Sequence, residues 1–390
     1  MSSKTKASGA KEDGEPVLVP KQRFPEFRDK PEWQLKPFKK LFSIGNGKDY
    51  KHLSTGEVPV YGSGGYMLSV DDYLHDGESV CIGRKGTINN PMFLTGKFWT
   101  VDTLFYTHSF NDCLPKFIYA IFQSIDWLKH NEAGGVPSLS KANIEKIETA
   151  VPRLPEQQKI AECLSSVDGL IAAQARKVDA LKTHKKGLMQ QLFPREGETQ
   201  PCLRFPEFQD AGEWVPLSVS QFAKVTTGAK DTQNKVDDGR YPFFVRSQTV
   251  ERIDSFSFDG EAVLTSGDGV GVGKNFHYIN GKFDFHQRVY CIYDFDKSVS
   301  GLFFYLYFSE HFGERVMRMS AKNSVDSVRM AMITEMPVVL PSRPEQQCIA
   351  DCLTSLDDLI TAETQKLEAL KTHKKGLMQQ LFPSPAAVEA

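Results

Sequence analysis

The sequence lacks a charge of one dominant sign. Its 390 residues include 47 Lys and Arg against 49 Asp and Glu, which leaves a formal net charge of −2. This balance excludes a globally basic nucleic-acid-binding protein, so any DNA contact needs positive charge that is gathered locally. Long hydrophobic runs are also missing, since no window approaches the roughly 20 apolar residues of a membrane-spanning helix. With no apolar signal core at the N-terminus, we expect a soluble cytoplasmic protein.

Cysteine is scarce and irregularly spaced. The seven cysteines are odd in number and follow no disulfide framework, which is typical of a reducing compartment. Cys348 and Cys352 are one helical turn apart, but no pair of histidines completes a ligand set, so we predict no metal site. Residues 1–16 are small, polar and charged, and we expect residues 1–20 and 384–390 to form disordered tails.

A recognisable catalytic constellation is absent as well. The glycine-rich run 266–274 resembles a phosphate-binding loop, but Asp268 and Asn275 stand where that loop needs Gly and Ser or Thr. Residues 90–93 differ by one residue from the Asn-Pro-Pro-aromatic motif of amino-methyltransferases, yet the glycine-rich cofactor loop of those enzymes is missing. We therefore predict a chain with no catalytic residues. A DNA adenine methyltransferase is kept as an alternative on residues 90–93 alone.

The sequence does contain an internal duplication. Residues 155–194 and 344–383 are identical at 29 of 40 aligned positions. A second pair of matching segments opens each half, since the Arg-Phe-Pro-Glu-Phe of residues 23–27 recurs at residues 204–208, each followed by Glu-Trp. We call these segments the opening motifs. Repetition at this level indicates a chain built from two like halves.

The repeated segments predict two long helices. Pro155 suits a first helical turn, Glu156 complements the positive end of the helix dipole, and Pro194 ends the segment. The apolar residues follow a heptad that is interrupted at the same two places in both copies, which favours a paired coiled coil over helices that pack only on their own domains. The predicted seam consists of Ile160, Leu164, Val167, Ile171, Val178, Leu181, Leu188, Leu192, Ile349, Leu353, Leu356, Ile360, Leu367, Leu370, Leu377 and Leu381.

The segments before each repeat predict two mixed α/β domains. Short β-branched and aromatic runs separated by Gly, Asn and Asp indicate strands, and residues 115–130 and 302–319 indicate helices. We assign domains to residues 21–152 and 195–341, and repeat helices to residues 153–194 and 342–383. The expected fold class is α+β, with two mixed α/β domains in pseudo-twofold symmetry, separated by two long antiparallel helices that form a coiled coil.

Loops of both domains carry groups suited to DNA. Arg and Lys can bind guanine edges, Asn and Gln bind adenine edges, and glycine lets the backbone approach a phosphate. Each residue taken singly is more often ordinary surface than a DNA contact, but the candidates form a cluster in each domain. The candidate DNA-binding residues are Ser63, Gly64, Arg84, Lys85, Thr87, Lys230, Arg246, Gln248, Lys274, Asn275, Gln287 and Arg288.

Together these motifs resemble the specificity subunits of type I restriction–modification systems. The resemblance covers residues 23–383 and is carried by the two opening motifs, by residues 83–87, and by residues 267–274 with 285–290. The Pro-Glu-Gln-Gln starts and Gly-Leu-Met-Gln-Gln-Leu-Phe-Pro ends of the repeated helices complete it.

The resemblance implies two target recognition domains, each of which reads one half of an asymmetric bipartite DNA site. It implies helices that fix the spacer and dock two modification subunits that methylate adenine, with added restriction subunits for cleavage. S-adenosylmethionine, ATP and Mg would belong to those partners, and no cofactor to this chain, in a bacterial or archaeal cytoplasm. A fused methyltransferase–nuclease as partner is an alternative, and so is a structural adaptor that binds protein.

Overall fold

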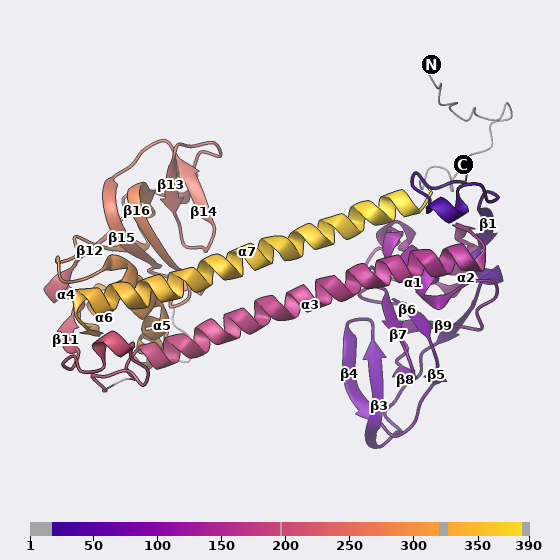
Figure 1. Cartoon of the computed structure of the whole chain (residues 1–390), viewed down its shortest axis with the longest axis horizontal. Helices are drawn as coiled ribbons and strands as arrows, with labels where there is room; N and C mark the ends of the chain where they lie inside the picture. Colours follow the sequence, from indigo (N-terminus) through magenta and orange to yellow (C-terminus); the bar gives the residue numbers. More distant parts are fainter. Residues whose placement is uncertain (1–17, 196, 320–326, 384–390) are drawn as a thin grey trace, which may run out of the picture. The chain divides into compact units, whose positions relative to one another are not determined.

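A computed structural model describes residues 18–195, 197–319 and 327–383. The chain forms two compact units, of which the first comprises Met1–Ala175 with Gln365–Ala390 and the second Arg176–Thr364 (Figure 1). Each long helix therefore contributes a part to each unit. Of the tails expected at residues 1–20 and 384–390, residues 1–17 and 384–390 lie outside the described residues. The end of the first tail was wrongly assigned, because Leu18 packs on the core of the first unit and its carbonyl accepts from Trp33 N at 3.1 Å.

The domain of the first unit holds two four-stranded sheets and a small antiparallel pair. The first sheet has the order β2 (Ser43–Asn46), β9 (Leu104–His108), β6 (Ser79–Gly83), β7 (Met92–Leu94), and the second β4 (Gly65–Val70), β3 (Thr55–Gly62), β8 (Lys97–Thr100), β5 (His75–Asp76). The pair is β1 (Gln34–Pro37) with β10 (Glu148–Val151), and the helices are α1 (Pro115–Ser124), α2 (Lys141–Lys146), η1 (Pro25–Phe27), η2 (Phe38–Lys40) and η3 (Trp127–His130).

The domain of the second unit holds one larger sheet. Its order is β12 (Lys224–Thr227), β17 (Val289–Tyr293), β15 (Phe258–Ser266), β16 (Phe276–Phe285), β13 (Tyr241–Phe244), β14 (Val250–Ile253). The pair β11 (Val215–Ser218) with β18 (Pro337–Leu340) matches β1 with β10, and the helices are α4 (Val219–Phe222), α5 (Gly301–Met319), α6 (Met330–Thr334), η4 (Pro206–Phe208), η5 (Thr232–Asn234) and η6 (Gly269–Gly271). Helix α5 packs on β15 and β16.

One predicted helix is shorter than the sequence pattern indicates. We expected residues 115–130 to be helical throughout, but α1 ends at Ser124 because Ile125 is extended, with ψ at 133°. The chain then turns so that the buried Trp127 donates its indole N–H to the carbonyl of Phe122 at 2.8 Å. That bond satisfies a carbonyl in the last turn of α1, and the chain continues as the 3₁₀ turn η3.

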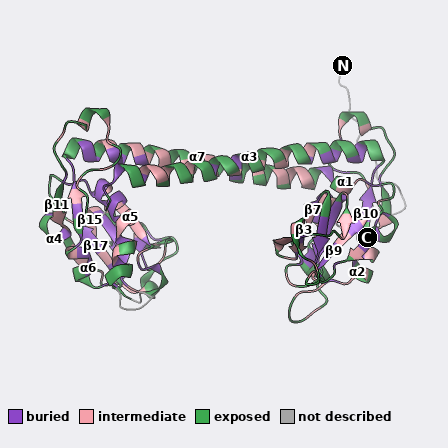
Figure 2. Ribbon diagram, turned by 90° about the horizontal axis from the view of Figure 1, so that it is seen from below, coloured by how far each residue is buried: buried purple, intermediate pink, exposed green. Residues whose placement is uncertain are grey.

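The repeated segments form two helices of 39 residues each, α3 (Leu154–Leu192) and α7 (Arg343–Leu381). Every residue of the predicted seam is buried or half-buried, and Figure 2 shows the exposed residues on the outer sides of both helices. In the first unit, Ile160 and Leu164 of α3 share a core with Leu381 of α7. In the second unit, Leu192 shares a core with Ile349 and Leu353. The start of one helix thus packs beside the end of the other in each unit, and the predicted α+β fold class with antiparallel long helices is confirmed.

Matched ion pairs occupy the second interruption of the seam, where Lys185 in one copy and Lys374 in the other replace an apolar residue. In the first unit, Lys374 Nζ lies 2.6 Å from Asp168 Oδ1. In the second, Lys185 Nζ lies 2.6 Å from Asp357 Oδ1. These four residues are equivalent in the duplication, so both units use the same polar contact to align α3 with α7.

The opening motifs bind the first turns of the helices that end their own halves. Arg23 donates to both carboxylate oxygens of Glu156 at 2.7 and 2.6 Å, and the Trp33 indole donates to Glu156 Oε1 at 3.2 Å. Glu156 is only 3% exposed, so its charge is buried but fully hydrogen-bonded. In the second unit, Arg204 and Trp214 make the same bonds to Glu345. The duplicated motifs therefore fasten each domain to a helix.

Candidate nucleic-acid interface

In the first domain, three loops meet at one end of the strands. The connection from β8 to β9 donates from Val101 N to the carbonyl of Tyr61 at 2.9 Å, near the tip of the β3–β4 hairpin. In the same connection, the carbonyl of Thr103 accepts a hydrogen bond from Arg84 N at 2.8 Å. This bond links the connection to the loop after β6. These backbone bonds set the relative positions of the hairpin tip and the loop that carries Arg84 and Lys85.

The second domain repeats this arrangement with other residues. His286 N donates to the carbonyl of Phe244 at 2.9 Å, and Gly267 N donates to the carbonyl of Arg288 at 2.7 Å. Counting along the chain from these equivalent bonds gives corresponding positions in the two domains. Ser63 corresponds to Arg246, Lys85 to Asp268, Thr87 to Val270, and Thr103 to Arg288.

The first domain brings its candidate residues together. A side chain added at Gly86 would place its Cβ 3.2 Å from Ser63 Oγ, so the loop of residues 84–87 touches the hairpin tip that holds Ser63 and Gly64. Gly86 has φ at +91°, a backbone conformation that favours glycine. Arg84, Lys85, Gly64 and Thr87 are all exposed. The Arg84 guanidinium lies over the Phe105 ring, 6.0 Å from its centre, in a cation–π contact.

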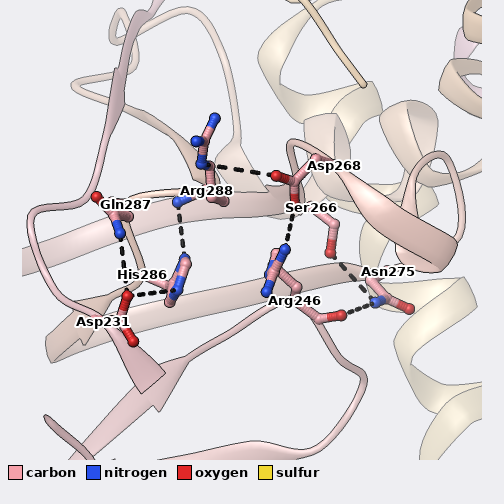
Figure 3. Close-up of polar contacts among 8 residues, drawn as sticks. All are labelled: Asp231, Arg246, Ser266, Asp268, Asn275, His286, Gln287 and Arg288. Carbon is pink, nitrogen blue, oxygen red and sulfur yellow. Dashed lines mark hydrogen bonds and ion pairs between the residues drawn. The ribbon is translucent and has the colours of Figure 1, made fainter. Parts of the chain in front are cut away.

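In the second domain, one carboxylate lies between two arginines (Figure 3). Asp268 Oδ1 accepts from Arg246 Nη1 at 2.9 Å, and Asp268 Oδ2 lies 3.7 Å from Arg288 Nε. The arginine side chains remain 46% and 65% exposed, whereas Asp268 is 24% exposed. Asp268 therefore contacts two guanidinium groups at once while leaving about half or more of each arginine side chain exposed.

A second carboxylate orders the neighbouring turn. Asp231 Oδ2 accepts from Gln287 Nε2 at 3.1 Å and lies 4.0 Å from His286 Nε2. Nδ1 of the buried His286 accepts from Arg288 N at 2.9 Å. Burial lowers the pKa of His286, and the charge of Arg246 lowers it further, so the neutral ring is favoured. A neutral ring can accept this bond, and it fixes the backbone that presents Gln287 and Arg288.

The remaining candidates of this domain differ in their availability. Asn275 is 8% exposed, and its Nδ2 donates to the carbonyl of Arg246 at 3.1 Å and to Ser266 Oγ at 3.3 Å. Since both amide hydrogens are used inside the domain, we correct its assignment from DNA contact to support of the loop. Lys230 Nζ lies 3.9 Å from Asp284, so part of its charge is balanced within the domain.

Gln248 and Lys274 link the hairpin to the glycine-rich loop. Gln248 Nε2 donates to the carbonyl of Lys274 at 2.9 Å, and both residues are exposed. This contact uses the backbone carbonyl of Lys274 and leaves its side chain exposed. Sequence reasoning did not assign Asp231 or Asp268 to the site, although Asp231 directly follows Lys230 and Asp268 lies in the glycine-rich run.

Other features singled out in the sequence have structural roles. Phe93, at the end of the segment that resembles a methyltransferase motif, lies in the edge strand β7 and packs against Tyr119 with ring centres 5.6 Å apart. Within the described residues, no group of three or more His, Cys, Asp or Glu side chains is placed to hold a metal ion. No helix in those same parts of the chain combines the length and apolar character needed to span a membrane.

Comparison with known proteins identifies the family. The model of the type I restriction modification DNA specificity domain matches residues 30–183 and again residues 211–372. The type I restriction enzyme MjaVIII specificity subunit of Methanocaldococcus jannaschii is 25% identical over 350 residues, which cover 83% of this chain and 79% of that protein. The EcoDI specificity subunit of Escherichia coli is 29% identical over 170 residues, 44% of this chain and 37% of that protein.

Solved structures share the fold. The type I restriction–modification S subunit of M. genitalium superposes with a TM-score of 0.63 at 14% identity, over 94% of this chain and 100% of that one. A chain from a study of complex assembly and conformational transition in a type I system superposes with a TM-score of 0.54 at 12% identity, over 91% and 98%. With its two matched specificity domains, the chain belongs to the family of type I restriction–modification specificity subunits, the non-catalytic DNA-recognition subunits of these systems.

Proposed function

We propose that this chain reads an asymmetric bipartite DNA site, with the domain of residues 21–152 on one half and that of residues 195–341 on the other. The observation that carries this proposal is one loop arrangement, held by the same backbone bonds, with unlike side chains in the two domains. Ser63, Lys85 and Thr103 in the first domain correspond to Arg246, Asp268 and Arg288 in the second. Similar frames with different donors and acceptors would bind different base sequences.

The chemistry of each cluster suits the major groove. Arginine is the commonest specific partner of guanine, to which it can donate two hydrogen bonds. Arg288 and Arg246 present such donors in the second domain, and Arg84 with Lys85 presents them in the first. Local positive charge of this kind also supplies the phosphate contacts that a chain of net charge −2 cannot supply globally.

We further propose that α3 and α7 fix the spacer between the half-sites and dock the partner subunits. The two continuous helices, with their matched seams and matched ion pairs, would form the spacer, and the number of helical residues would set the number of unread base pairs. The partners would be two modification subunits, which carry S-adenosylmethionine and methylate adenine, and restriction subunits that use ATP and Mg. The complex would work in the cytoplasm of a bacterium or archaeon.

Methylation profiling of a host genome with and without this gene tests the proposal. The expected result is one asymmetric motif of two short sequences at a fixed separation, methylated at adenine only when the gene is present. The purified chain, reconstituted with its modification subunits, should then retain a duplex carrying that motif in preference to a scrambled duplex. An uninterrupted motif, or no gene-dependent motif at all, would contradict the proposal.

A further inference from the structure

The loop after β15 exposes an apolar side chain at its tip. Val270 is 94% exposed and lies between Gly269, with φ at +76°, and Gly271. A single exposed apolar residue is common on protein surfaces and needs no explanation by itself. The hydrogen bonds within this loop, and the contacts of its Asp268 with two arginines, set Val270 apart from the other exposed valines.

The loop is held in one conformation by its own hydrogen bonds. Val272 N donates to the carbonyl of Gly269 at 3.2 Å, and Asn275 N donates to that of Gly271 at 2.9 Å. A Cβ added at Gly271 would lie 2.1 Å from Asn275 Nδ2, so the buried amide packs directly against the loop. The tip therefore does not fold back to bury Val270, and the valine is presented outward.

Val270 also belongs to a loop that contacts two arginines. Asp268, two residues earlier, contacts both Arg246 and Arg288 (Figure 3), so the loop that carries Val270 is tied to both arginines. The first domain has the same loop, because Gly86 and Gly269 both have positive φ and both precede the tip residue. Its tip residue is the exposed Thr87, a second side chain with a methyl group.

We propose that Val270 packs against the C5-methyl group of a thymine in the half-site read by the second domain, with Thr87 in the corresponding place in the first. This inference rests on the proposed function. Thymine alone presents a methyl group in the major groove, and an apolar side chain is its partner there. Contact would remove the valine side chain and the thymine methyl group from water, which is favourable. In the free protein, the valine side chain stays exposed.

The test removes the methyl group from the DNA. The reconstituted complex is bound to the duplex identified by methylation profiling, in which each thymine of the second half-site, on either strand, is replaced by deoxyuridine in turn. One replacement should weaken binding of the wild-type complex about fourfold, the effect of losing one buried carbon group. In a V270A complex, the same replacement should have little further effect. V215A, which shortens another exposed valine of this unit in β11, should keep the full response.

The outcomes separate this inference from the function beneath it. A wild-type complex that does not prefer the profiled duplex over a scrambled one contradicts the proposed function. If that preference is present, the thymine contact is overturned by a half-site without thymine, by replacements that all leave binding unchanged, or by an equal response in the V270A complex.

Discussion

At the scale of single residues, the two domains differ in how they handle charge. The first exposes Arg84 and Lys85 on the loop itself, whereas the second places Asp268 at the position of Lys85 and takes its positive charge from Arg246 and Arg288 on the neighbouring loops. Each domain thus keeps cationic donors at the same edge, but from different positions. A base sequence that fits one pattern would therefore not fit the other.

Removing Arg288 should weaken binding to the cognate duplex. If its guanidinium contacts a base, R288A should cost about 1–3 kcal/mol on the cognate site and much less on random DNA. Titration of the reconstituted complex with labelled duplexes measures both values. K282A, which removes a positive charge near Phe256, is the control and should have a small effect on either duplex. An equal loss on cognate and random DNA would indicate that Arg288 contacts phosphate only.

The buried pair of Arg23 and Glu156 should be important for stability. The two side chains are 6% and 3% exposed, so E156Q leaves an arginine buried without its counter-charge. Breaking such a pair from one side costs about 3–5 kcal/mol. Urea unfolding of wild type and E156Q measures the change, with E162Q, on the exposed side of the same helix, as the control. Equal unfolding midpoints for E156Q and wild type would show that the pair contributes nothing.

At the scale of helices and strands, the long helices could be predicted from the sequence. The residue-by-residue equivalence of the two domains could not. A heptad with matched breaks and a terminal Pro194 is a local signal, and it predicts α3 and α7 to within two residues. After the opening motifs, the sequences of the two domains match only at residues 96–98 and 281–283. The remaining equivalences depend on backbone bonds such as those of Val101 and His286, which any side chain permits.

Side-chain partners across loops were also beyond the sequence. Asn275 is a residue type that can read bases, yet its amide donates to Ser266 Oγ and to the carbonyl of Arg246. These two partners come from separate segments of the chain. The opening motifs and the helix starts were both visible as repeats. That Arg23 binds Glu156, 133 positions away, follows only from the packing of the folded domain.

Lengthening both helices together should change the spacer and leave the half-sites unchanged. Four residues inserted after Ala175 and after Thr364, which are equivalent positions at the boundary of the units, add about 6 Å to each helix. This length corresponds to roughly two base pairs along B-DNA. Methylation profiling of a strain with this variant measures the separation. Altered half-site sequences, or an unchanged separation, would count against helices that set the spacing.

At the scale of the whole molecule, both halves attach their domain to its helix by the same hydrogen bonds. Arg23, Trp33 and Glu156 make the same bonds as their counterparts Arg204, Trp214 and Glu345. The glutamines that follow also agree, since Gln157 accepts from Leu114 N and Gln346 from Ser300 N, at 2.9 and 2.8 Å. The duplicated residues therefore attach a domain to its helix without regard to which domain it is.

Because these contacts are equivalent, a chimera with two copies of the first domain should fold. Replacing residues 204–341 by a second copy of residues 23–152 keeps the Arg, Trp, Glu and Gln contacts at both attachments. We expect a folded chain whose methylated motif carries the first half-site on both sides of the spacer. Profiling a strain that expresses the chimera gives the motif directly. A motif that still contains the original second half-site would contradict the assignment of reading to residues 195–341.

The identical ends of α3 and α7 also bear on the history of the gene. Leu181–Pro194 and Leu370–Pro383 are the same peptide, so the reading frame encodes one message twice in the same direction. Recombination between two such copies would delete the second domain and the start of α7. The product would keep one recognition domain, one opening motif and one long helix whose exposed seam fits a second copy of itself. The duplication that gave the chain two like halves thus also makes possible a single event that returns it to one.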